Sequence, residues 1–170
     1  LVDFEHYLRW FHYLSGITWI GLLYYFNFVQ VPAMAAATAD KEPGPAAIGK
    51  YVAPLALVWF RWGAVVTWVT GAWYLQDHGM LHAAFALQEG YTRGIGIGAW
   101  LGTIMLFNVW VLIWPNQQKV LGLNKYASSP ASPDEINQAK KTALLASRTN
   151  TVLSIPMLLF MGSGHNLLGI

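Results

Sequence analysis

The stretch VAPLALVWFRWGAVVTWVTGAWYL, residues 52–75, is apolar and aromatic except for its threonines and one charged residue, Arg61. About 20 apolar residues in helical form are enough to span the hydrocarbon core of a bilayer. A charge at that depth is costly unless it has a partner, reaches the headgroups or serves a function. The stretch therefore predicts a membrane-spanning helix whose arginine needs an explanation.

The composition of the whole chain agrees with a membrane protein. Of the 170 residues, 55% are hydrophobic and only 11% are charged, whereas about 25% are charged in a typical soluble domain. The net charge of +2 is too small and too scattered to favour nucleic-acid binding. The chain has no cysteine, which excludes disulfides, cysteine-ligated metal clusters and covalent c-type haem attachment within it.

Three further stretches have the same apolar character. The predicted fold is an all-α integral membrane protein, a four-transmembrane-helix bundle forming one domain over residues 1–170, with spans at about 10–34, 52–75, 95–114 and 142–168. Pro115 is expected to end the third span, and Pro156 to kink the fourth. Residues 132–135, Ser-Pro-Asp-Glu, predict a capping box that starts the fourth helix in water. A short surface helix is expected within residues 77–88.

The positive charges predict an orientation. Loops 40–50 and 115–141 would lie on the same side of the membrane, and they carry Lys41, Lys50, Lys119, Lys125, Lys140 and Lys141. The opposite side has Arg9 and Arg93. Cytoplasmic loops are enriched in lysine and arginine, so the two lysine-bearing loops are expected inside and both termini outside.

The histidines are expected near the outer face, where they suggest two kinds of site. His12 and His165 lie at comparable depth on the first and fourth spans, and they are candidate axial ligands for haem b, with Arg9 and Arg93 as candidate propionate partners. The alternative is that both histidines hydrogen-bond to carbonyls or to polar residues at the helix ends. His78 and His82 are one helical turn apart, so they form a weak metal-site candidate, and solvated surface histidines are the simpler interpretation.

Glycines and arginines within the spans suggest packing and ligand sites. Gly94, Gly98 and Gly102 recur every four residues and predict close helix packing. Arg61 is expected to hydrogen-bond within the bundle, with an anionic ligand as the sharper alternative. Arg148 is nearer the end of its span and can extend towards the inner interface, but it is also a candidate for binding an anion. Candidate neutral partners for Arg61 share amide side chains: Asn27, Gln30, Asn108 and Asn150.

Three stretches, His12–Phe28 (HYLSGITWIGLLYYFNF), Asn108–Gly122 (NVWVLIWPNQQKVLG) and Ala146–Asn166 (ASRTNTVLSIPMLLFMGSGHN), together resemble the membrane domain of the bacterial membrane-bound urate hydroxylase family. The resemblance implies a helical protein of the bacterial inner (plasma) membrane, linked to an oxidation whose electrons pass to a c-type cytochrome. Longer members of the family end in such a cytochrome domain. This chain has no cysteine for a c-type haem, so it resembles a short form that lacks that domain.

Three functions follow from these features, in order of preference. The first is an accessory subunit that packs against other membrane subunits of a larger respiratory, oxygenase or photosynthetic complex. The second is an electron-transfer protein that holds haem b through His12 or His165 and passes electrons to a c-type cytochrome. The third is a urate-oxidising enzyme with an anion at Arg61. The spans contain no carboxylate, which disfavours a proton relay of the pump type.

Overall fold

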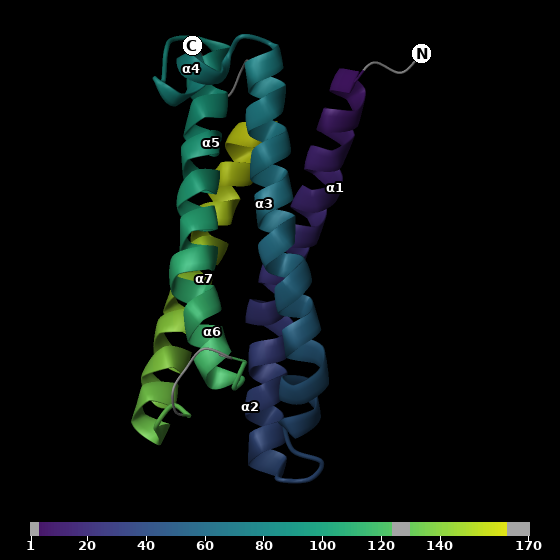
Figure 1. The fold of residues 1–170 in the computed structure, drawn as a ribbon, viewed down its shortest axis with the longest axis vertical. Helices are drawn as coiled ribbons and strands as arrows, with labels where there is room; N and C mark the ends of the chain where they lie inside the picture. Colours follow the sequence, from purple (N-terminus) through teal and green to yellow (C-terminus); the bar gives the residue numbers. More distant parts are fainter. Residues whose placement is uncertain (1–3, 124–129, 163–170) are drawn as a thin grey trace.

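The computed structural model describes residues 4–123 and 130–162, and in these residues every regular element is helical. Four long helices, each long and apolar enough to cross a membrane, lie side by side along one axis (Figure 1). They cover Phe4–Asp40, Ile48–Asp77, Tyr91–Val120 and Pro133–Gly162. The all-helical architecture and the four span-length helices are therefore confirmed.

Three of the four long helices are built from consecutive segments of different helical pitch. The first consists of α1 (Phe4–Tyr24), the π-helical segment η1 (Tyr25–Gln30) and α2 (Val31–Asp40). The second consists of the π-helical η2 (Ile48–Val52) and α3 (Ala53–Asp77), and the third of α5 (Tyr91–Phe107), the π-helical η3 (Asn108–Ile113) and α6 (Trp114–Val120). The fourth is α7 (Pro133–Gly162), and a short α4 (Leu81–Phe85) connects α3 to α5.

Each π-helical segment lies directly before a proline. Pro32, Pro54 and Pro115 are the second residues of α2, α3 and α6, so each follows η1, η2 or η3 by one residue. A proline ring clashes with the carbonyl four residues earlier in an α-helix, and in all three cases that carbonyl lies in the π-helical segment. The wider π turn gives the ring room, so the helix continues. The sequence had suggested that Pro115 ends the third helix, and that prediction is wrong.

Asparagine side chains satisfy backbone carbonyls next to two of these wide turns. Asn27 Nδ2 donates to the carbonyl of Leu23 at 2.9 Å, and Asn116 Nδ2 donates to the carbonyl of Leu112 at 2.7 Å. An unsatisfied carbonyl in hydrocarbon is costly, so these amides stabilise the interruptions in the helical hydrogen-bond pattern.

The start of α7 has the predicted capping box. The backbone N–H of Ser132 donates to Glu135 Oε2 at 2.8 Å, and the backbone N–H of Glu135 donates to Ser132 Oγ at 3.3 Å. Pro156 lies within α7 and does not end it. The last part of the fourth predicted span, residues 163–168, lies outside the described residues.

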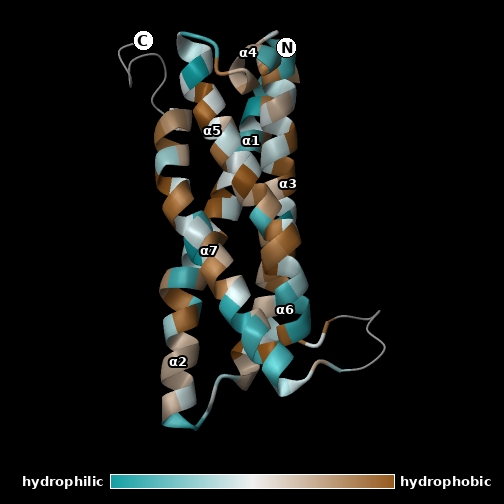
Figure 2. Ribbon diagram, turned by 90° about the vertical axis from the view of Figure 1, so that its left-hand side faces the viewer, coloured by the Kyte–Doolittle hydropathy of each residue, from teal (hydrophilic) through white to brown (hydrophobic). Residues whose placement is uncertain are grey.

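The helices run alternately up and down, so the connections between them lie at the two opposite ends of the bundle. One end holds the tip of α2, the start of η2, the end of α6 and the start of α7; we call it the lysine end, because it carries Lys41, Lys50, Lys119, Lys140 and Lys141 (Figure 1). The opposite end holds the start of α1, the end of α3, α4 and the start of α5. Figure 2 shows hydrophilic residues around α6 and the loop after α2, at the lysine end.

The tightest helix pair is α1 against α3, where small residues let the two backbones approach. A side-chain carbon added to Gly63 would lie 3.4 Å from the backbone nitrogen of Trp19, and one added to Gly16 would lie 3.7 Å from Thr67. Thr67 Oγ1 also donates to Ser15 Oγ at 3.0 Å. Small residues are the usual means of close helix packing in lipid, where no hydrophobic effect drives helices together.

Polar contacts join the first and third long helices to α7. Asn108 Nδ2 donates to Asn150 Oδ1 at 2.8 Å, and Asn150 Nδ2 donates to the carbonyl of Met105 at 2.9 Å. Asn150 is fully buried. Tyr24 and Ser154 share a hydrogen bond of 2.9 Å, which connects α1 to the same helix.

The glycines of α5 do not act together as one packing stripe. Gly98 contacts Met161 of α7, with the methionine Sδ 3.4 Å from an ideal Cβ, but a Cβ at Gly94 or Gly102 would meet no atom within 4 Å. The closest approach is at Gly96, where a Cβ would collide with the carbonyl oxygen of Ala84. The reason is that α4 folds back onto the α5 face that carries Gly96, a contact between neighbouring elements that glycine spacing alone does not indicate.

Candidate functional site

Arg61 lies on α3 with its guanidinium stacked on an indole ring of the third long helix. Its Cζ is 3.7 Å from the centre of the Trp114 ring and 5.9 Å from that of Trp110. The two tryptophans are four residues apart, on the last turn of η3 and the first of α6, so they present one aromatic face to α3. Trp110 also packs edge-on against Trp62, with ring centres 5.4 Å apart.

The guanidinium is only partly satisfied by this environment. Arg61 Nε and Nη1 are buried and have no hydrogen-bond partner in residues 4–123 and 130–162. Trp110 Nε1, in the same cluster, is also buried without an acceptor. A cation–π contact stabilises the positive charge but leaves the N–H donors unused. The cluster therefore offers several buried donors to one acceptor-rich group.

The amide side chains predicted as hydrogen-bond partners of Arg61 bond to other groups. Asn108 and Asn150 bond to each other, and Asn27 Nδ2 donates to Ser147 Oγ at 2.8 Å. None of these amides bonds to Arg61 in the part of the chain that the structure describes. The expected hydrogen bonding of Arg61 within the bundle is thus wrong for these residues, because their amides serve helix–helix contacts.

Buried acceptors without donors occur in the neighbouring segment η1. Asn27 Oδ1 and Gln30 Oε1 are both buried and unpartnered among the described residues. This segment reaches α3 beside the arginine, since the rings of Phe26 and Phe60 are 5.5 Å apart and edge-on. Unsatisfied donors on α3 and η3 and unsatisfied acceptors on η1 therefore fall in one half of the bundle, towards the lysine end.

An apolar groove of about 430 Å³ lies on the outer side of α3 and the third long helix. Trp110 is shared between this groove and the Arg61 cluster. The other lining residues are almost all apolar, and Thr103 already accepts a hydrogen bond from Trp68 Nε1 at 2.9 Å. The groove suits an apolar chain rather than an anion; its lining comprises Val65, Trp68, Thr103, Leu106, Phe107, Trp110 and Val111.

His12 faces α3 rather than α7. Its Nδ1 is 2.8 Å from the carbonyl oxygen of Thr67, and its ring lies against Gly71, where a Cβ would come within 2.7 Å of Cε1. A carbonyl contact of this kind orients structural histidines and metal-ligating histidines alike. His165 lies outside the described residues, so the predicted pairing of the two imidazoles stays a prediction.

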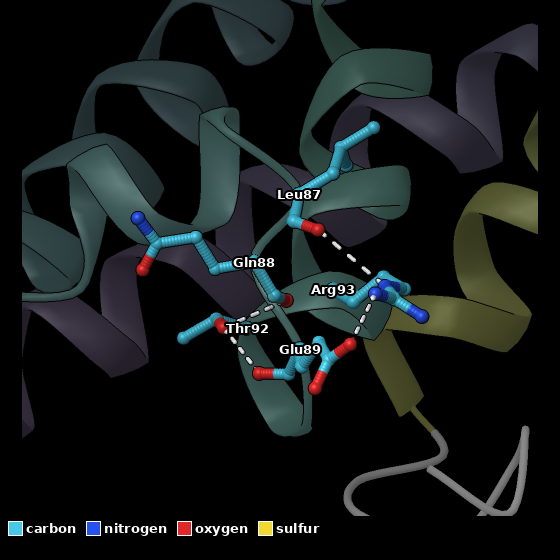
Figure 3. Close-up of polar contacts among 5 residues, drawn as sticks. All are labelled: Leu87, Gln88, Glu89, Thr92 and Arg93. Carbon is cyan, nitrogen blue, oxygen red and sulfur yellow. Dashed lines mark hydrogen bonds and ion pairs between the residues drawn. The ribbon is translucent and has the colours of Figure 1, made fainter.

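The arginines predicted to hold haem propionates have other neighbours. Arg93 Nη2 is 3.6 Å from Glu89 Oε1, and Arg93 Nε donates to the carbonyl of Leu87 at 3.4 Å (Figure 3). Arg9 lies over the ring of Tyr13, with Cζ 5.8 Å from its centre. Neither arginine is brought to His12 by a contact that the structure records, so the described residues do not assemble a propionate site and we derive no step through haem.

His78 and His82 are both exposed; His78 follows the last residue of α3, and His82 is the second residue of α4. His78 uses both ring nitrogens, Nδ1 at 2.8 Å from the carbonyl of Tyr74 and Nε2 at 3.3 Å from Glu5 Oε1. Residues 4–123 and 130–162 contain no group of three or more potential ligands that could hold a metal ion. The described residues therefore give the weak metal candidate no further ligand.

Arg148 lies on the outer face of α7, and its exposed side chain makes no hydrogen bond or ion pair within the described ranges. It is separate from the Arg61 cluster, so the two candidate anion-binding arginines do not form one site.

A comparison with known families identifies the chain. A family model described as urate oxidase N-terminal matches residues 78–168, which is more than half of the 170 residues. The chain belongs to the urate oxidase N-terminal family. No curated protein and no solved structure matches it. The predicted resemblance to a urate-related family is confirmed at the level of the family, while the short form without a cytochrome domain stays a prediction.

The family match covers part of the Arg61 cluster. Trp110 and Trp114 lie within the matched residues, together with the polar network of Asn108 and Asn150, whereas Arg61 lies before them. Sequence reasoning singled out Arg61 but missed the two tryptophans. Their spacing of four residues in NVWVLIWP was the available signal, since it places both indoles on one face of a helix.

Proposed function

We propose that this chain is the membrane-embedded, substrate-binding part of a urate-oxidising system, and that Arg61 binds the anionic substrate. The observation that carries the proposal is the half-buried Arg61 side chain, whose Nε and Nη1 are buried without acceptors in the described residues. Its aromatic neighbours Trp110 and Trp114 lie in the part of the chain that matches a family named for urate oxidase.

The energetics favour an anionic ligand at this position. A buried charge needs compensation, and the contact with Trp114 supplies only part of it, about 2 kcal/mol for a desolvated cation–π pair. Hydrogen bonds to charged groups contribute roughly 1.5–3 kcal/mol each. An anion that accepts from Nε and Nη1 would therefore convert an unfavourable buried group into a favourable contact.

The unpartnered acceptors of η1, in the same half of the bundle as Arg61, support urate among the anions considered. Urate is a planar anion at neutral pH, with carbonyl oxygens and N–H groups around its rim. Its oxygens would accept from Arg61 and Trp110, and its N–H groups would donate to the free oxygens of Asn27 and Gln30. Flat rings also pack well against the indole faces that surround the arginine.

The proposed setting is the bacterial plasma membrane, with the lysine end in the cytoplasm. The support is the concentration of exposed lysines at that end, which matches the positive-inside rule. On this orientation the start of α1 and the end of α7 lie on the outer side, and the Arg61 cluster is in the cytoplasmic half of the bundle.

Urate oxidation releases two electrons, and the electron acceptor we propose is a c-type cytochrome. With water as the oxygen source, hydroxylation forms a carbon–oxygen bond and releases two protons with the two electrons. A c-type cytochrome takes one electron at a time, so each turnover would reduce two of them.

Binding to the purified protein in lipid nanodiscs tests the proposal. Urate should quench tryptophan fluorescence, because Trp110 and Trp114 flank the arginine. Arg61→Gln should weaken the affinity about 10- to 100-fold, the equivalent of one charged hydrogen-bonding group, and Arg61→Lys should retain part of it. Arg93→Gln is the matched control, since it removes an arginine paired with Glu89 at the other end. A folded Arg61→Gln protein with unchanged urate affinity would refute the proposal.

A role as an accessory subunit is the second candidate, and the favouring observation is the large exposed surface. Within the most hydrophobic window of each long helix, only 17–39% of residues are buried. Lipid or other subunits can cover such a surface. Purification from the native membrane in mild detergent distinguishes these cases: a stable larger complex, with no urate binding by the isolated chain, would favour the accessory role.

A further inference from the structure

The outer face of α7 carries a cation in the middle of an apolar stripe. Arg148 is exposed, and so are Leu145, Val152 and Ile155, with exposed fractions of 68%, 66% and 64%. Arg148 lies 15 residues after the start of α7, and no hydrogen bond or ion pair involves it in the part of the chain that the structure describes. A solitary exposed cation at this place needs a partner from outside the chain.

The geometry of a helix directs this arginine towards the lysine end. Side chains on an α-helix tilt towards the helix N-terminus, which for α7 is the end carrying Lys140 and Lys141. Lys141 is seven residues before Arg148, so the two lie roughly 20° apart around the helix and about 10 Å apart along it. Both side chains are long enough to meet at one group between them. Lys140 lies roughly 80° from Arg148 around the helix and points away from this stripe.

No carboxylate lies between these two cations on α7 or beside Arg148 on the last turns of the third helix. Residues 138–162 of α7 and residues 108–123 of the neighbouring third helix contain no Asp or Glu, and α6 adds the exposed Lys119. Of the acids at the start of α7, Glu135 is engaged by Ser132, and Asp134 lies about 10 Å from Lys141 and about 20 Å from Arg148 along the axis, on the water side of both cations. The local field is therefore positive.

We propose that Lys141 and Arg148 form a binding site for an anionic glycerophospholipid, such as phosphatidylglycerol, in the leaflet at the lysine end. The phosphate accepts from both side chains, and one acyl chain lies along the apolar residues that continue the stripe, Val152 and Ile155. The charge complementarity and the direction of the stripe both favour a lipid over an acidic protein segment, because Val152 and Ile155 extend the apolar surface to the side of Arg148 that is deeper in the membrane.

This inference depends on the proposed membrane placement of α7, but not on urate binding. It is tested without urate, so either proposal can fail alone. The protein is placed in nanodiscs of phosphatidylcholine with and without phosphatidylglycerol, and the bound phosphatidylglycerol is measured by native mass spectrometry. A cation near a bilayer surface contributes about 1 kcal/mol, so Arg148→Gln and Lys141→Gln should each weaken phosphatidylglycerol binding about five-fold.

Lys140→Gln is the control, because it removes the same charge from another face of α7 at nearly the same depth. It should leave phosphatidylglycerol binding within about two-fold of the unmodified protein, because Lys140 points away from the stripe and contributes only a long-range attraction that salt screens. Equal losses in Lys140→Gln and Lys141→Gln would show a non-specific surface charge and overturn the site. So would an Arg148→Gln protein that binds phosphatidylglycerol normally, or one whose only change is loss of self-association.

Discussion

The contact between Gly71 and His12 yields the sharpest prediction about stability. An ideal Cβ on Gly71 would lie 2.7 Å from His12 Cε1 and 2.9 Å from His12 Nδ1. The same Nδ1 is held 2.8 Å from the carbonyl oxygen of Thr67. Gly71→Ala must therefore push the imidazole away and weaken that bond, in the closest helix pair of the bundle.

The cost follows from three terms. Overpacking a well-filled site costs typically 1–3 kcal/mol, and losing the bond to Thr67 costs about 0.5–1.5 kcal/mol. Alanine in place of glycine within a helix recovers roughly 1 kcal/mol. The expected net effect of Gly71→Ala is a loss of about 2 kcal/mol in the free energy of unfolding.

Unfolding in mixed micelles with increasing denaturing detergent, followed by circular dichroism, measures this loss. Gly102→Ala is the matched control, because its added Cβ would meet no atom within 4 Å. It should be neutral or stabilising by up to about 1 kcal/mol. In a His12→Ala background the ring is gone, so Gly71→Ala should then cost nothing. The reasoning is refuted if Gly71→Ala costs the same with and without the imidazole, or no more than Gly102→Ala.

Two other substitutions test the interior and the α4 contact. Asn150→Leu should destabilise the bundle by about 1–3 kcal/mol in the same assay, because it removes two interhelical hydrogen bonds and leaves the buried Asn108 amide without its partner; no loss would show that the network is dispensable. Gly96→Ala should displace α4, since its Cβ would collide with the backbone of Ala84, and hydrogen exchange of residues 81–88 should speed up while that of α7 stays unchanged. Normal protection of α4 in this variant would contradict the contact.

The number and rough place of the long helices could be predicted from sequence because hydrocarbon thickness sets a simple length requirement. The capping box was equally accessible, since it depends on residues three apart in the chain. The prediction that Pro115 ends the third helix is wrong for a physical reason. The rule that proline stops a helix assumes α-helical pitch, and the π-helical η3 removes the clash on which the rule rests.

The neighbours of Arg61 and His12 could not be predicted, because they depend on which helix faces which. Arg61 was recognisable because it is the one charged residue in a long apolar stretch of the sequence. Its stacking on Trp114 depends on α3 lying beside the third helix, which the sequence does not indicate. The haem hypothesis required His12 to face α7, and the alternative was a hydrogen bond to a carbonyl. The small residues Gly16, Gly63 and Gly71 favour the approach of α1 to α3, where His12 Nδ1 contacts the carbonyl of Thr67. Glycine spacing indicates that close packing can occur, without saying against which partner.

The wide turns before Pro32, Pro54 and Pro115 also affect how related chains should be aligned. A π turn accommodates one residue more than an α turn, which rotates everything beyond it by roughly 100° relative to an uninterrupted helix. A relative with an ordinary turn at the same place would need a one-residue gap there. Without that gap, an alignment through Asn108–Ile113 would assign lipid-facing positions of α6 to the bundle interior, and the indole opposite Arg61 would be matched to the wrong residue.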